Sequence, residues 1–69
     1  MEVTRIKIHP NYAVAMFTKY NPIYFTIENQ KPKKFFFIPE GEEHIDITPI
    51  LCKEVKKTIF LALREELNK

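Results

Sequence analysis

Hydrophobic and polar residues alternate along most of the first 47 positions of the chain, which is typical of β-strands with one buried face. Short clusters of Pro, Asn and Gly interrupt the alternation and indicate turns. The pattern predicts five strands, over residues 3–8, 12–18, 23–28, 34–38 and 44–47. Because the connections are short, neighbouring strands should pair antiparallel, since parallel neighbours need a long crossover.

Two of these segments do not alternate. Residues 12–18 and 35–38 are apolar at consecutive positions, so either of their faces could be buried. The pattern therefore leaves open which face of the sheet is covered.

The period of the pattern changes after Thr48. Thr48 is a favourable helix N-cap residue, and Pro49 suits the first helical position because its missing N–H would have no partner there. A helix is predicted over residues 49–67. With the helical period, one stripe of it is apolar and should pack on the sheet: Leu51, Cys52, Val55, Ile59, Ala62 and Leu63.

Together these elements predict an α+β fold. We expect an antiparallel β-meander of four or five strands with one C-terminal α-helix packed on one sheet face. The 69 residues are enough for one domain, over residues 1–69, and too few for two.

Composition narrows the class of protein further. With 45% hydrophobic residues and a net charge of only +2, the chain is not of the disordered type. One Cys cannot form an intramolecular disulfide, and one Cys with two His is too few for the usual zinc site. The apolar runs are shorter than the roughly 18 residues that span a membrane, and the first nine residues are charged. We therefore expect a cytoplasmic, intracellular protein without a membrane partner.

Few residues suggest catalysis. The sequence has no Ser and a single Gly, which excludes a serine nucleophile and a Gly-rich phosphate-binding loop. Cys52 falls on the apolar stripe and is interpreted as a buried structural thiol. Glu42, His44 and Asp46 could form an acid–base or divalent-metal site, so a weak metal-dependent activity stays open as an alternative. Otherwise we expect no enzyme activity, no cofactor and no metal.

A binding surface is easier to argue, because one helix leaves the second sheet face free. Basic and aromatic side chains interleaved on a sheet are typical of proteins that bind single-stranded nucleic acid, where cations contact phosphates and rings stack on bases. The residues predicted to contact phosphates are Arg5, Lys7, Lys31, Lys33 and Lys34. The residues predicted to stack on bases are Phe17, Tyr24 and Phe36.

The alternative is a regulatory or inhibitory protein that acts through protein–protein contact. The chain has more apolar surface than a monomer of this size can bury, and such patches mark interfaces. The contact would use a strand edge or the outer face of the helix, that is Ile50, Lys53, Lys57, Leu61 and Arg64. The partner would be a second copy of the chain, which we expect, or a different protein.

The end of the predicted sheet also resembles a known family. The turn Pro39-Glu40-Gly41-Glu42, followed by Ile45-Asp46-Ile47-Thr48-Pro49, leads from a last strand into a capped helix. This order of elements is similar to the single-stranded DNA-binding domain of the PC4-like transcriptional coactivators. The resemblance implies the same meander-then-helix fold and assigns no role to individual residues.

Overall fold

Five strands lie in one sheet in the order in which they occur along the chain, β1-β2-β3-β4-β5, and each is antiparallel to its neighbour. The computed structural model describes residues 2–39, 41 and 43–69. The elements are β1 (Val3–Ile8), β2 (Ala13–Phe17), β3 (Ile23–Glu28), β4 (Lys31–Phe37), β5 (Ile45–Asp46) and the helix α1 (Lys53–Leu67). The predicted α+β fold is confirmed.

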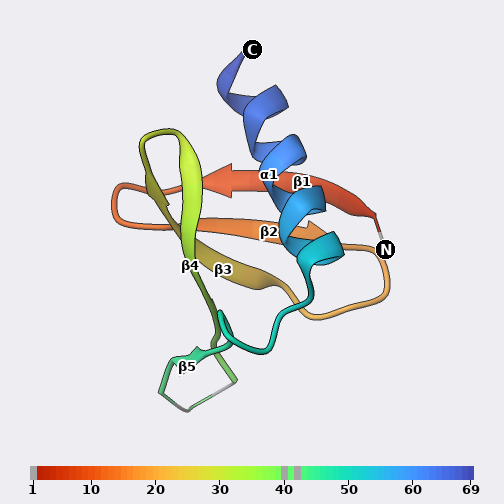
Figure 1. Ribbon diagram of the computed structural model, residues 1–69. Coiled ribbons are helices and arrows are strands. Elements are labelled where there is room, and N and C mark those ends of the chain that lie inside the picture. Colours follow the sequence, from red (N-terminus) through yellow and green to blue (C-terminus); the bar gives the residue numbers. More distant parts are fainter. Residues whose placement is uncertain (1, 40, 42) are drawn as a thin grey trace.

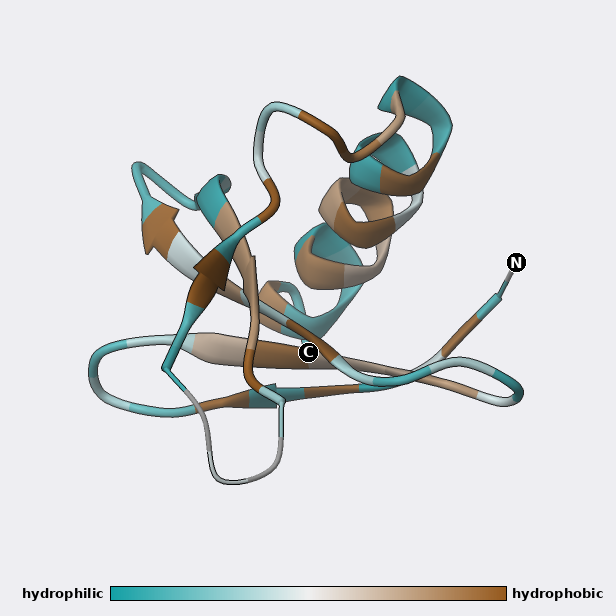
Figure 2. Ribbon diagram, turned by 90° about the horizontal axis from the view of Figure 1, so that it is seen from below, coloured by the Kyte–Doolittle hydropathy of each residue, from teal (hydrophilic) through white to brown (hydrophobic). Residues whose placement is uncertain are grey.

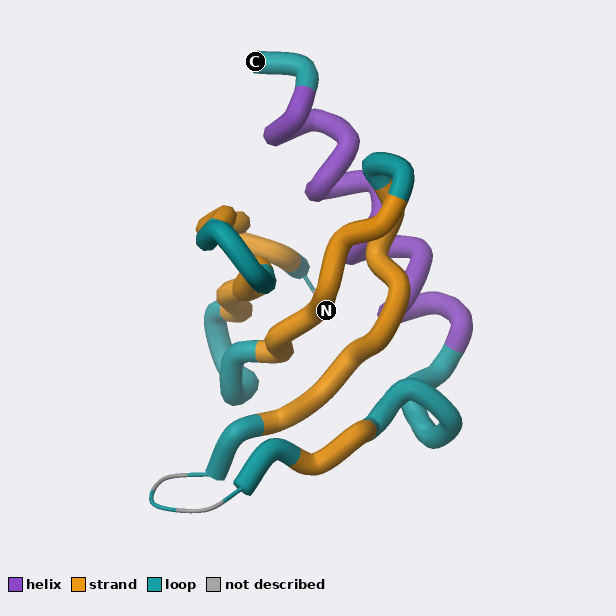
Figure 3. Tube along the Cα trace, turned by 90° about the vertical axis from the view of Figure 1, so that its left-hand side faces the viewer, coloured by secondary structure: helices purple, strands orange, loops and turns teal. Residues whose placement is uncertain are grey.

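The helix lies on one side of this sheet only (Figures 1 and 3). It contacts β1 and β4, which are separated in the sheet by β2 and β3. The sheet therefore twists and curves around the helix, as right-handed strand twist favours. Figure 2 shows hydrophobic residues along the strands and the helix, with hydrophilic residues at the hairpin turns. In the described residues, no helix combines the length and the apolar character needed to cross a bilayer.

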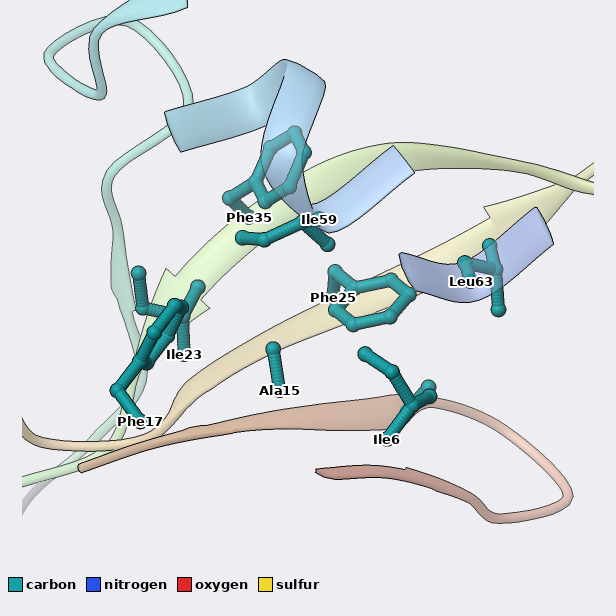
Figure 4. Close-up of a cluster of buried hydrophobic side chains, with 9 residues drawn as sticks. Ile6, Ala15, Phe17, Ile23, Phe25, Phe35, Ile59 and Leu63 are labelled. Carbon is teal, nitrogen blue, oxygen red and sulfur yellow. The ribbon is translucent and has the colours of Figure 1, made fainter. Parts of the chain in front are cut away.

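Small residues at the centre of the sheet determine which face the helix covers. Ala13 and Ala15 of β2 are fully buried, and their small side chains leave room for larger ones from the other elements. Phe25 from β3 and the helix residues Ile59 and Leu63 fill this space and are themselves fully buried. Figure 4 shows Phe25 lying between the strand and helix side chains of this core. The face that the sequence pattern left undecided is thus the Ala13 and Ala15 face.

Two register shifts change which side chains face the core. In β1, Val3 is paired with Phe17 and Arg5 with Met16, so β1 carries one extra residue at this point. Such a bulge reverses the alternation locally. Val3 consequently packs against the core, although its parity in the strand matches that of exposed Arg5.

The second register shift lies in β4, which also begins three residues earlier than predicted. Asn29 and Gln30 form a two-residue hairpin turn with positive φ angles of 54° and 65°, so pairing starts at Glu28 and Lys31. Pro32 is tolerated in this strand because β5 pairs only with Phe36 and Phe37. The first half of β4 is therefore an edge, where a missing N–H leaves no neighbour unsatisfied.

The start of the helix differs from the prediction. Thr48 does not cap the helix: its hydroxyl accepts a hydrogen bond from the Phe35 N–H (2.9 Å) and donates one to the Phe35 carbonyl (3.1 Å). The backbone then turns, with the Ile50 and Leu51 N–H groups both donating to the Ile47 carbonyl. The helix can begin only after this turn, with Cys52 at the N-cap position. Cys52 is consequently exposed, and its assignment as a buried thiol was wrong.

Candidate nucleic-acid interface

The sheet face opposite the helix, called the open face below, carries one side chain from each strand in a continuous line. Strand pairing joins Lys7 to Val14, Val14 to Tyr24, Tyr24 to Phe36 and Phe36 to Asp46. Directly paired residues share a face, so this line crosses all five strands. Antiparallel pairing thus brings residues from positions 7 to 46 onto one surface.

Aromatic rings form a second, diagonal line on the same face, which we call the aromatic row: His9, Tyr12, Tyr24, Phe36 and His44. The centroid separations of successive rings are 4.8, 5.9, 5.9 and 5.0 Å. The ring planes are inclined by 25°, 48°, 22° and 17°, so three of the four contacts are stacked. Contacts of this kind hold rings in fixed orientations.

An apolar residue is buried on the open face itself. Val14 is only 6% exposed, although its side chain lies opposite the helix and outside the main core cluster. Its paired neighbours are Lys7 and Tyr24, so side chains of the open face cover it. The open face is therefore a packed surface with its own small apolar centre.

Three cations border the aromatic row. Strand pairing places Arg5 and Lys7 on the open face of β1, and Arg5 also lines a hollow against the end of α1. Lys34 precedes buried Phe35 in β4 and so points to the same side as Phe36. All three are exposed, which leaves their charges available to an anionic ligand.

One carboxylate lies at the β5 end of this surface. Asp46 accepts a hydrogen bond from the Thr48 N–H at 2.9 Å. The Thr48 side chain, the Thr48 backbone N–H and the charge of Lys34 together lower the pKa of Asp46 below its ordinary value of 3.8. The group is therefore ionised at neutral pH, and repulsion disfavours a phosphate at this end of the row.

The structure separates the residues that the sequence grouped as one nucleic-acid surface. Arg5, Lys7, Lys34, Tyr24 and Phe36 lie together on the open face. The other three predicted residues are Phe17, Lys31 and Lys33.

Phe17 was predicted to stack on bases, and this placement is corrected. It is 8% exposed, pairs with Val3 on the helix side and belongs to the core. Lys31 and Lys33 line a groove between β4 and α1, although Lys31 is paired with Glu28 of β3 and Lys33 forms an ion pair with it. The register shift in β4 lies between the Phe25–Phe35 and Ile27–Pro32 pairs.

Four residues of the alternative interface, Lys53, Lys57, Leu61 and Arg64, follow one stripe of α1, because they are three or four residues apart. Ile50 (77% exposed) precedes the helix, and Leu61 (46% exposed) lies on its outer face. Lys53 is exposed in the first turn of α1. Lys57 and Arg64 line hollows on the β4 side of the helix.

The possible metal site lies only partly within the described residues. Glu42 lies outside the described residues. His44 stacks on Phe36, and Asp46 is bonded to Thr48. Within the described ranges, the His, Cys, Asp and Glu side chains include no group of three placed to hold a metal ion.

Sequence reasoning missed three members of the aromatic row and one lysine of the groove. His9 and Tyr12 flank the first hairpin turn, where the His9 N–H donates to the Tyr12 carbonyl at 2.8 Å. Recognising this turn as a tight one would have placed both rings on one face. The position of His44 beside Phe36 depends on the pairing of β4 with β5, which local patterning does not determine. Lys56 lines the groove between β4 and α1, and nothing in the sequence pattern distinguishes it from the other lysines of the helix.

No known protein family matches this chain, and no curated protein or solved structure matches it either. Its role has to be inferred from the surfaces described above.

Proposed function

We propose that this chain is a small non-enzymatic module that binds single-stranded nucleic acid across the open face of its sheet. The observation that carries the proposal is the aromatic row, an unbroken series of five rings on a face that no described element covers. Rings held in place in the free protein lose little conformational freedom when a base stacks on them, which favours binding.

Base stacking and phosphate contacts would both contribute to the affinity. Each base that stacks on an aromatic side chain contributes about 1–3 kcal/mol. Arg5, Lys7 and Lys34 add phosphate contacts along the border of the row. Two stacked bases would contribute about 2–6 kcal/mol, and the phosphate contacts would add to this against the cost of association.

The test is fluorescence anisotropy with labelled single-stranded DNA and RNA of about 20 nucleotides. Binding should be saturable and should weaken between about 50 and 200 mM salt, with a log–log slope of about −0.7 per phosphate contact. Absence of binding at the lower salt concentration would refute the proposal.

Variants connect this binding to the open face. Phe36→Leu removes a ring but retains an apolar side chain, so the fold should persist while affinity falls about 5- to 150-fold per lost stacking contact. Tyr20→Leu is the matched control, because Tyr20 is exposed and lies outside the aromatic row. Equal affinities of these two variants would place the ligand elsewhere.

A protein partner is the second candidate, favoured by the exposure of Ile50 in the turn before the helix and of Leu61 on the helix. In that case the chain would regulate or inhibit the partner, or form a homodimer, through the outer helix face. Leu61→Asp should then abolish the complex without unfolding the chain. Size-exclusion chromatography with light scattering, on wild type and variant, separates a homodimer from a monomer.

A further inference from the structure

A groove runs between the outer half of β4 and the helix, on the other side of the sheet from the aromatic row. Its volume is about 470 Å³, within the range of small-molecule sites. The residues that line it, called the basic groove below, are Lys31, Pro32, Lys33, Phe35, Thr48, Lys56, Lys57 and Phe60.

Cations come from both walls of the basic groove. Lys31 and Lys33 belong to β4, and Lys56 and Lys57 belong to α1. Among the residues that the structure describes, the lining includes no Asp or Glu. The groove is therefore positive from two directions, and opposed walls of one sign concentrate an anion between them.

Arg64 and the two acidic residues that follow it in α1 line different hollows. Arg64 lines a neighbouring hollow that shares Lys31 and Phe60 with the basic groove. The acidic residues Glu65 and Glu66 line a hollow on the opposite side, against β1, together with Arg5 and Lys69. These two carboxylates therefore lie away from the β4 side of α1, where they would repel a bound anion little.

The floor of the groove is apolar. Phe35 is buried and Phe60 is half-buried, and Pro32 adds a third ring. The Lys56 Nζ lies 6.0 Å from the centre of the Phe35 ring, which holds this ammonium at the apolar floor. The Thr48 hydroxyl is already bonded to the Phe35 backbone, so lysines are the polar groups left to meet a ligand.

One acidic neighbour competes weakly. Glu28 forms an ion pair with Lys33 at 3.5 Å, and both side chains are 58% exposed. Exposed pairs of this kind contribute little free energy. Lys33 therefore remains able to exchange this partner for a bound anion.

We propose that the basic groove binds a nucleotide, with its base against the half-buried Pro32 and Phe60 and its terminal phosphate between the lysines of the two walls. A monoanion would leave most of the four lysines without a counter-charge, whereas a phosphomonoester carries about −1.5 to −2 at pH 7. The apolar floor favours a ligand in which a ring is attached to that phosphate. This site is separate from the open face and does not depend on the function proposed for it.

Isothermal titration calorimetry with three probes tests the two halves of the site. Adenosine 5′-monophosphate should bind more tightly than inorganic phosphate, which lacks the base, and than adenosine, which lacks the charge. In two-dimensional NMR, amide signals of residues 56, 57 and 60 should shift on titration. Equal affinity for all three probes, or no binding of adenosine 5′-monophosphate at millimolar concentration, would overturn the proposal.

A matched pair of double variants connects binding to the groove. Lys31→Gln with Lys56→Gln removes one cation from each wall and should weaken nucleotide binding roughly tenfold or more, as charge-assisted hydrogen bonds predict. Lys19→Gln with Lys69→Gln makes the same change in net charge outside the groove and should leave affinity unchanged. Equal losses in both would show a general charge effect and overturn the site.

The nucleotide could be free or could be the phosphorylated end of a strand, and oligonucleotides distinguish these sources. If a 5′-phosphorylated strand binds more tightly than its 5′-hydroxyl counterpart, and the groove double variant removes the difference, the ligand is a strand end. If the two strands bind equally while adenosine 5′-monophosphate still binds, the ligand is a free nucleotide. Phe36→Leu should not affect mononucleotide binding, so failure of the groove and failure of the open face are told apart.

Discussion

Tyr24 and Phe36 lie directly opposite each other on β3 and β4, with ring centroids 5.9 Å apart and ring planes inclined by 22°. Both rings are half-buried, although they lie on the sheet face that the helix leaves open. Each also contacts a further ring, Tyr12 in one case and His44 in the other. The pair is therefore the centre of the aromatic row, and its integrity is required for the proposed interface.

The Tyr24–Phe36 contact should have a measurable coupling energy. Aromatic pairs contribute about 0.5–1.5 kcal/mol beyond the area that they bury. A double-mutant cycle with Tyr24→Leu and Phe36→Leu, followed by urea unfolding, should recover a coupling of this size. Additive effects of the two substitutions would mean that the rings are neighbours without interacting.

Thr48 should stabilise the fold by fixing the chain between β5 and the helix. Thr48→Val retains the shape of the side chain but leaves the part-buried Phe35 N–H without its partner. We expect a loss of about 1–3 kcal/mol in the free energy of unfolding.

Thr58→Val is the control for this substitution. The Thr58 hydroxyl donates to the Glu54 carbonyl within the exposed surface of the helix. Its removal should change the free energy of unfolding by no more than about 0.5 kcal/mol. Similar losses in the free energy of unfolding for both variants would show that the hydrogen bonds of Thr48 to Phe35 do not stabilise the fold more than an exposed helix hydrogen bond does.

Prediction from the sequence succeeded where local patterning decides the structure. The bounds of β1 and β3 are the predicted ones, because both strands alternate clearly and end at turns. Prediction from the sequence failed where contacts between residues far apart in the chain determine the structure. Thr48 has the local chemistry of an N-cap, but the Phe35 backbone competes for its hydroxyl and moves the helix start to Lys53.

The functional surfaces were partly predictable for the same reason. Strand parity placed Lys7 and Tyr24 on one face, because no bulge lies between them and their partners. Parity could not exclude Phe17, whose strand is apolar on both sides. The basic groove could not be predicted, because it depends on the position of α1 against β4.

The pKa of Asp46 should lie below 3.8, because the Thr48 side chain and N–H and the charge of Lys34 favour its ionised form. A group whose pKa is lower in the folded state stabilises the fold above its unfolded pKa. That contribution is lost as the pH falls from 3.8 through the folded value. NMR titration of Asp46, the only Asp in the sequence, measures the shift directly.

Asp46→Asn provides the matching stability experiment. The variant should lose stability relative to wild type at neutral pH, and the difference should shrink as the pH is lowered through the folded pKa of Asp46. A difference that stays constant with pH would contradict the role of the ionised carboxylate.

The core should respond to the loss of a single methyl group. Ile59 is fully buried against the sheet, so Ile59→Val should cost about 0.5–1.5 kcal/mol in the free energy of unfolding. Ile50→Val makes the same chemical change at a position that is 77% exposed and should be close to neutral. Thermal or urea unfolding of the two variants measures the contrast.

The edge formed by the first half of β4 also bears on solubility. A second copy of the sheet could extend it only by hydrogen bonding to residues 31–34, which β5 does not pair with. Pro32 offers no N–H there, and Lys31, Lys33 and Lys34 would bring like charges together. The lysines assigned to ligand binding therefore also oppose the addition of a second sheet at this edge. Neutralising several of them should lower the solubility of the protein.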